Sequence, residues 1–112
     1  MRAKVIINEN HKLLPEQKEI LDKRFGDGGW VKFPVPSEGW NLDQMVEVKL
    51  QLQNDPIVFV SPIPYLIREL AIVNTNLILI FHNDHREAKE ITLPNGQKKI
   101  IHTVSKHGWK LV

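Results

Sequence analysis

The chain contains no cysteine among its 112 residues, so disulfide bonds, thiolate metal sites, iron–sulfur clusters and a cysteine nucleophile are excluded. Its apolar runs fall far short of the roughly eighteen residues that a membrane-spanning helix requires. The apolar run at the N-terminus is also too short for a signal peptide. With no internal repeat, low-complexity segment or linker, the sequence predicts one soluble, cytoplasmic domain over residues 1–112, without a membrane partner.

Sequence motifs of several catalytic classes are missing as well. There is no GxSxG nucleophile turn, no GxxxxGK[ST] phosphate loop and no HExxH metal helix. His82 and His85 lie three residues apart with Asp84 between them, but on a loop this spacing does not fix a common face. We therefore expect no metal site and no cofactor.

The chain also has little net charge, because 15 basic residues stand against 13 acidic ones. A formal charge of +2 is too small to predict binding to duplex nucleic acid. The charge is uneven, however: residues 82–112 contain six lysines or arginines, three acids and four of the five histidines. Two interpretations are open for this basic loop and hairpin extension, which either faces an anion or uses its lysines only to stay solvated.

Helix and turn signals divide the chain into short elements. Pro15 suits a first helical position and Gly26 a helix end, while Asn41 and Gln44 have the spacing of a capping box. A Pro-Asn-Gly sequence at residues 94–96 predicts a hairpin turn. The expected elements are strand 4–8, helix 15–25, strand 30–35, helix 42–53, strand 57–60, helix 64–73, strand 77–81, and a hairpin of 89–93 with 97–103.

The segment 42–53 has two possible interpretations. Its apolar residues alternate with polar ones from Val46 to Gln53, which is typical of a half-buried strand. Its residues are nevertheless good helix formers, and a parallel strand at Ile57 requires a crossover before it. We favour the helix.

The runs 57–60 and 77–81 are apolar without alternation, which is typical of parallel strands buried on both faces. The order of elements predicts a small three-layer α/β domain, with a mostly parallel four-stranded sheet and a C-terminal β-hairpin. The tail from Lys106 is expected to close the sheet edge. The helix 64–73 is apolar nearly all round, which indicates either deep burial within the chain or contact with a second subunit.

Polar residues follow the expected strands, at the edge where α/β sheets bind their ligands. His82 can move a proton, Arg86 can hold a phosphate, and Asn83 can orient either group. For Ser61 the alternative is simple helix capping, and for Trp40, which we expect to be exposed, it is packing. The candidate site residues are Asn8, His11, Trp40, Ser61, His82, Asn83 and Arg86.

Residues 6–17 (IINENHKLLPEQ) and 58–66 (VFVSPIPYL) resemble small CRISPR-associated proteins of the ring-nuclease type. The likeness covers about the first seventy residues as an order of elements. It implies a compact Rossmann-like fold and a homodimer that binds cyclic oligoadenylate across its two-fold axis, with the apolar helix 64–73 at the dimer contact.

The same resemblance implies cleavage of the ligand without metal, through attack of a ribose 2′-hydroxyl on the adjacent phosphorus. Arg86 would steady the phosphate, His82 or His11 would transfer protons, and Asn8 and Ser61 would hold ribose or phosphate oxygens. Two other functions stay open: a nucleotide-binding protein that does not cleave its ligand, or a protein-interaction accessory of a phage or defence system.

Overall fold

The structure is a computed structural model that describes residues 2–83, 86–104 and 108–112, with the side chains of 86–89 and 101–104 left out. Asp84 and His85 of the candidate cluster lie outside the described residues. In chain order the described elements are β1 (Ala3–Asn8), α1 (Pro15–Phe25), β2 (Trp30–Val35), α2 (Leu42–Leu52), β3 (Ile57–Phe59), α3 (Pro64–Val73), β4 (Ile78–Asn83), β5 (Arg86–Thr92), β6 (Lys98–Val104) and β7 (Trp109–Leu111).

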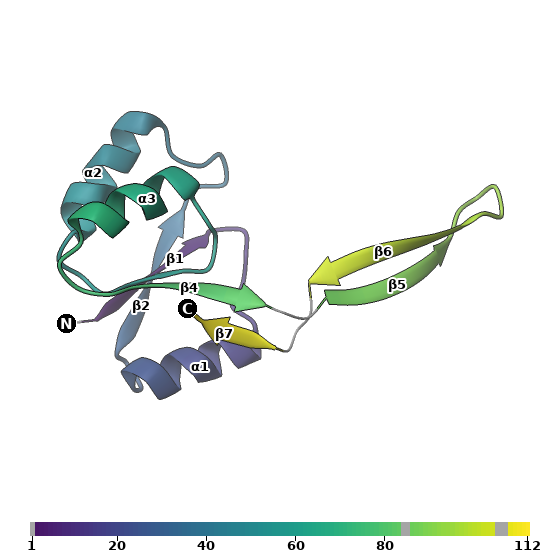
Figure 1. Ribbon diagram of the computed structural model, residues 1–112, viewed down its shortest axis with the longest axis horizontal. Coiled ribbons are helices and arrows are strands. Elements are labelled where there is room, and N and C mark those ends of the chain that lie inside the picture. The colour runs from purple at the N-terminus through teal and green to yellow at the C-terminus, as the bar shows by residue number, and fades with distance from the viewer. Residues whose placement is uncertain (1, 84–85, 105–107) are drawn as a thin grey trace.

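The main sheet has the strand order β2-β1-β3-β4-β7 (Figure 1). The first four strands are parallel, and β7 runs antiparallel to β4. The expected number of four strands was therefore wrong, because the C-terminal tail adds a fifth. That the tail closes the sheet edge is confirmed, and the pairing continues past β7, where Ile80 and Val112 exchange backbone hydrogen bonds of 2.8 and 2.9 Å.

The ambiguous segment 42–53 is a helix, as favoured. Asn41 and Gln44 form the expected capping box: the Asn41 side chain accepts from the Gln44 amide at 2.8 Å, and the Gln44 side chain accepts from the Asn41 amide at 2.9 Å. Val48 and Leu52, one turn apart, are buried against the sheet. The alternating pattern therefore reflects a helix that buries only one side.

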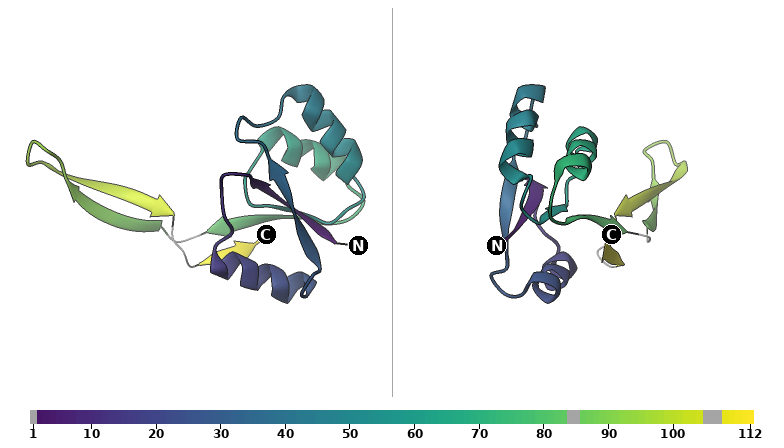
Figure 2. Two further views of the ribbon diagram at one scale, coloured as in Figure 1. Left: turned by 180° about the vertical axis from the view of Figure 1, so that it is seen from behind. Right: turned by 60° about the vertical axis from the view of Figure 1, so that its left-hand side comes forward.

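Helices cover both faces of the sheet, α1 on one face and α2 with α3 on the other (Figure 2). Successive residues of a strand point to opposite faces. Accordingly Val5 and Ile7 pack on the α1 side, while Ile6 packs with Phe59 on the α2 and α3 side. These two clusters explain why the central strands are apolar without alternation, and they make the fold three-layered.

Strand β7 is fastened to the start of α1 through Glu16. One carboxylate oxygen of Glu16 accepts hydrogen bonds from the backbone N–H groups of Gly108 and Trp109, both at 3.0 Å. The Trp109 ring packs edge-on against Phe81, with ring centroids 6.2 Å apart. A short edge strand is thus held by a side chain that lies more than ninety residues earlier in the sequence.

Helix α3 buries only one side within the chain. Leu66 and Leu70 are fully buried against the sheet, whereas Ala71, Ile72 and Val73 are exposed, Ile72 at 74%. Deep burial on several sides within one chain, one of the two interpretations of this helix, is therefore wrong. No helix in the described part of the chain has the length and apolar composition to cross a bilayer.

Strands β5 and β6 form a separate two-stranded sheet, which we call the β5–β6 arm (residues 86–104). The arm stands clear of the body (Figures 1 and 2). Its turn is closed by a bond of 2.7 Å from the Leu93 amide to the Gln97 carbonyl, with Gly96 at a φ of 84°. The radius of gyration of 16.7 Å exceeds the value of about 13 Å for a compact domain of this length, because the arm projects.

Candidate functional site

The strand order reverses direction between β1 and β3. Strand β1 continues into α1 on one face of the sheet, and β3 continues into α3 on the other face. Such a divergence opens a crevice at the carboxyl ends of the strands, where α/β proteins bind their ligands. The crevice here is a pocket of about 430 Å³, within the usual size of small-molecule sites.

We call this cavity the strand-end pocket. Its lining comes from the ends of β1, β2 and β3, from the loop that enters α2 and from the start of α3. The lining residues are Asn8, Val35, Ser37, Glu38, Gly39, Trp40, Met45, Ser61, Pro62, Ile63, Pro64 and Tyr65.

Ser61 joins the two strands that diverge at the pocket. Its hydroxyl oxygen accepts a hydrogen bond of 2.9 Å from the backbone N–H of Asn8. The capping interpretation of Ser61 was wrong, because the N-cap of α3 is Ile63. A hydroxyl that accepts one hydrogen bond keeps its own proton as a donor, so Ser61 can offer that proton to a ligand oxygen.

Asn8 shapes the turn that leaves β1. Its side-chain oxygen accepts from the Asn10 amide at 2.9 Å, and its carbonyl accepts from the His11 amide at 2.9 Å. These bonds use the oxygens of Asn8 locally and leave its side-chain NH₂ group at the pocket edge as a donor.

Trp40 lies in the loop between β2 and α2. The expectation that it is exposed was wrong, because Trp40 is half-buried and packs against Phe33, with ring centroids 5.9 Å apart at an interplanar angle of 63°. It nevertheless lines the pocket. The loop is held to the β1 turn by the Ser37 amide, which donates to the carboxylate of Glu9 at 2.9 Å.

The first turn of α3 faces the pocket without a side-chain cap. Ile63 at the N-cap offers no acceptor, and Pro64 has no N–H. Backbone amides of the first turn of an uncapped helix carry a partial positive charge. Tyr65 lines the pocket there, and the guanidinium of Arg68 lies 5.4 Å from the centre of its ring.

Tyr65 and Arg68 were not among the predicted site residues. Residues three apart lie on the same helix face. Tyr65 and Arg68 have this spacing near the start of the helix that follows Ser61, and this spacing could have predicted them as site residues.

Four of the predicted site residues do not line this pocket. His11 is exposed in the turn after β1. His82 and Asn83 were expected in a loop, which was wrong, because pairing with β7 extends β4 to Asn83 and sets His82 opposite Lys110. Arg86 is the first residue of β5. The structure therefore brings together Asn8, Trp40 and Ser61.

The charge of the pocket lining is modest and negative. Glu38 is the acid among the lining residues, and Arg68 contacts the Tyr65 ring but does not itself line the pocket. Among the described residues, no three His, Asp or Glu side chains are grouped so as to hold a metal ion. The arrangement offers hydrogen-bond donors and aromatic rings rather than strong charge.

Comparisons with protein-family models, with curated proteins and with solved structures find no match to this chain. Fold and site define a class: a small three-layer α/β protein with a pocket at the strand ends.

Replacing Ser61 by alanine is expected to lower the free energy of unfolding by about 1–2 kcal/mol, because the half-buried Asn8 amide loses its acceptor. Urea denaturation followed by circular dichroism measures the change. Ser37→Ala is the matched control, since Ser37 also lines the pocket but is exposed, and its hydroxyl donates to the exposed Glu38 carboxylate at 3.3 Å instead of accepting from a backbone amide. Equal losses in both variants would contradict a structural role for the Ser61 hydroxyl.

Proposed function

We propose that this chain binds a nucleotide in the strand-end pocket, and that the ligand is a cyclic oligoadenylate second messenger of antiviral signalling. The observation that supports the proposal is the composition of one pocket of about 430 Å³. Donors from Ser61, Asn8 and the start of α3 suit phosphate and ribose oxygens, while the rings of Trp40 and Tyr65 suit stacking on a base.

The cyclic ligand is suggested by the resemblance of residues 6–17 and 58–66 to ring-nuclease-type proteins, and with it a Rossmann-like ancestry of the fold. A symmetric ring of nucleotides requires equivalent pockets around an axis, which a homodimer supplies. Helix α3 is the proposed contact, because Ala71, Ile72 and Val73 are apolar and exposed. The first turn of the same helix reaches the pocket, so this contact would couple the two sites.

The proposed reaction is a transesterification without metal. The ribose 2′-oxygen forms a bond to the adjacent phosphorus while the bond to the 5′-oxygen breaks, leaving a 2′,3′-cyclic phosphate and a 5′-hydroxyl. The proton of the 2′-hydroxyl is passed to a base, and the leaving oxygen takes up a proton. Ser61 would orient a phosphate oxygen. Arg86 with His82 or His11, which lie outside the lining of the pocket, would supply charge and proton transfer to the part of the ring that extends beyond it.

A second candidate function is binding without cleavage. The observation that favours it is that the lining of the pocket in the described chain includes no histidine. A protein of this kind would sequester the nucleotide and release it unchanged.

Calorimetric titration of the purified chain with cyclic tetra- and hexa-adenylate tests the proposal, with linear oligoadenylate of the same length and AMP as controls. The expected result is micromolar or tighter binding of one cyclic ligand per dimer. Chromatography of the incubated ligand, with and without EDTA, separates the two functions: cleavage that EDTA does not inhibit indicates the nuclease, and intact ligand indicates sequestration. No binding of either ring would reject the proposal.

A further inference from the structure

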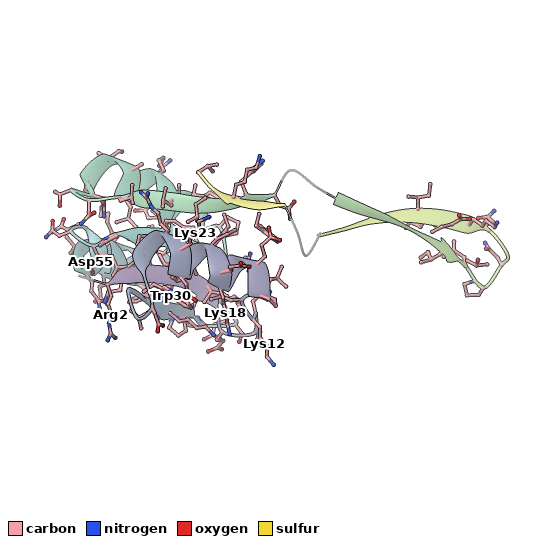
Figure 3. The ribbon with its side chains drawn as sticks, turned by 90° about the horizontal axis from the view of Figure 1, so that it is seen from below. Arg2, Lys12, Lys18, Lys23, Trp30 and Asp55 are labelled. Carbon is pink, nitrogen blue, oxygen red and sulfur yellow. The ribbon has the colours of Figure 1, made fainter. Side chains whose placement is uncertain are left out.

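The β5–β6 arm lacks the layer that normally stabilises a pair of strands. An isolated two-stranded hairpin in water is marginally stable, and folded domains cover such a ribbon with a helix or another sheet. In this chain the arm points away from the body (Figures 1 and 3). Ile100 on β6 is 65% exposed, and Ile91 on β5 and Leu93 just after it are only half-buried. The arm is therefore built to pack against something outside its own chain.

The base of the arm lies at the pocket edge of the sheet. The arm continues directly from the carboxyl end of β4, which runs parallel to β1 and β3, whose carboxyl ends form the strand-end pocket. Each strand of the arm has seven residues and therefore spans about 23 Å, whereas five strands side by side are about 19 Å wide. One arm is thus long enough to cross the whole carboxyl edge of another copy.

The charges of the arm and of the pocket rim are opposite in sign. The arm contains four basic and two acidic residues: Arg86, Lys89, Lys98, Lys99, Glu87 and Glu90. Lys98 is paired with Glu90 at 3.4 Å, while Lys99 has no ionic partner in the described part of the chain. The rim loops 8–14 and 36–43 contain three acidic residues, Glu9, Glu38 and Asp43, and one basic residue, Lys12.

An acidic rim by itself repels an anionic ligand, since like charges a few ångströms apart disfavour each other. A cation from a second copy would offset this repulsion and add to the donors of Ser61, Asn8 and the start of α3. Lys98 and Lys99 are consecutive residues of a strand, so their side chains lie on opposite faces of the ribbon. Lys98 pairs with Glu90 on one face, and Lys99 can contact a second copy from the other face.

We infer that the arm of one copy lies across the strand-end pocket of a second copy, where Lys99 supplies positive charge to an anionic ligand. The contact is reciprocal, so that each pocket is completed by its partner's arm. The docking of the arm rests on its shape and charge, and the role of Lys99 toward the ligand rests on the proposed function.

Disulfide trapping tests the docking without any ligand. Because the chain has no native cysteine, only the introduced cysteines can form a disulfide. One chain carries Ile91→Cys, which pairs with Lys99 across the ribbon and lies on the same face of the arm, and a second chain with a different tag carries Glu38→Cys on the pocket rim. Mixing them under oxidising conditions is expected to give a disulfide between the two differently tagged chains. The control replaces Glu38→Cys by Lys23→Cys, because Lys23 lies in the last turn of α1, a helix that contributes no residue to the pocket lining, and is expected to give little product.

Complementation tests the role of Lys99. Lys99→Glu and Trp40→Ala are each expected to weaken binding of cyclic tetra-adenylate at least tenfold, one through the arm and the other through the pocket. In an equal mixture of the two variants, half of the dimers are mixed, and each of these has one intact pocket completed by an intact arm, so part of the lost binding returns. An arm that serves its own pocket gives no recovery.

The outcomes separate the two proposals. Trapping without ligand binding rejects the proposed function and supports the docking of the arm. A chain that is monomeric by light scattering and gives no specific trapping overturns the inference, even if it binds nucleotide. It is also overturned by a monomer that binds a duplex DNA through Lys98 and Lys99, since a β-ribbon fits the major groove as well.

Discussion

Phe59→Ala is expected to lower the free energy of unfolding by about 3–5 kcal/mol, a large part of the stability of a domain of this size. Phe59 is fully buried in β3, the central strand between β1 and β4, and packs beneath α2 and α3. Removing its ring leaves a cavity that three layers of structure cannot close by local adjustment. Urea denaturation at several protein concentrations measures the loss.

Two further variants keep this prediction testable. Phe59→Leu retains most of the apolar volume and is expected to cost less than the alanine variant, which guards against a chain that does not fold at all. Ile72→Ala removes an apolar side chain from α3 that is 74% exposed, so the change should stay within about 0.5 kcal/mol for the isolated chain. A loss at Ile72 equal to that at Phe59 would contradict the assignment of the core.

Much of this fold is predictable because its signals are local. The bounds of α1 and α3 follow from a proline at the first helical position of each, and Gly26 ends α1 at a φ of 84°. The apolar run of β3 identifies a strand buried on both faces, whereas the similar run of β4 is half-buried except at Phe81, which is buried. The prolines and Gly26 restrict the backbone locally, and the apolar runs can be recognised from their own composition, so these elements are predictable without knowledge of distant residues.

The extent of β4 and the fifth strand depend on distant residues. Strand β7 has only three residues, too few for a periodic pattern, and its position is set by Phe81 and by the carboxylate of Glu16. Because β7 pairs with His82 and Asn83, those residues become strand rather than loop. Their local sequence contains no sign of this pairing.

The candidate site, like the fold, could be predicted from the sequence only in part. The rule that ligands bind at carboxyl ends of parallel strands identified Asn8 and Ser61, and the structure joins them by a hydrogen bond. The same rule treated every strand end as equivalent. The pocket instead forms where the chain diverges between β1 and β3, so residues at the end of β4 lie outside its lining, and Tyr65 in the next helix lies within it.

Trp40→Ala is expected to weaken nucleotide binding by about 10- to 100-fold, because the loss of one aromatic stacking partner costs 1–3 kcal/mol per base. Trp30→Ala is the matched control. Both tryptophans are half-buried, but Trp30 begins β2 at the opposite edge of the sheet, where its indole N–H donates to Asp22 at 2.8 Å. Calorimetric titration with cyclic tetra-adenylate measures both variants.

Both substitutions remove buried aromatic surface, so both should lower the thermal midpoint of unfolding. Only Trp40→Ala should also weaken binding at a temperature where each variant is folded, as checked by circular dichroism. If the two variants bind the nucleotide equally well, base stacking on Trp40 is wrong and the ligand lies outside the strand-end pocket. If both lose binding in proportion to their stability, the effect at Trp40 comes from the fold and not from contact with the base.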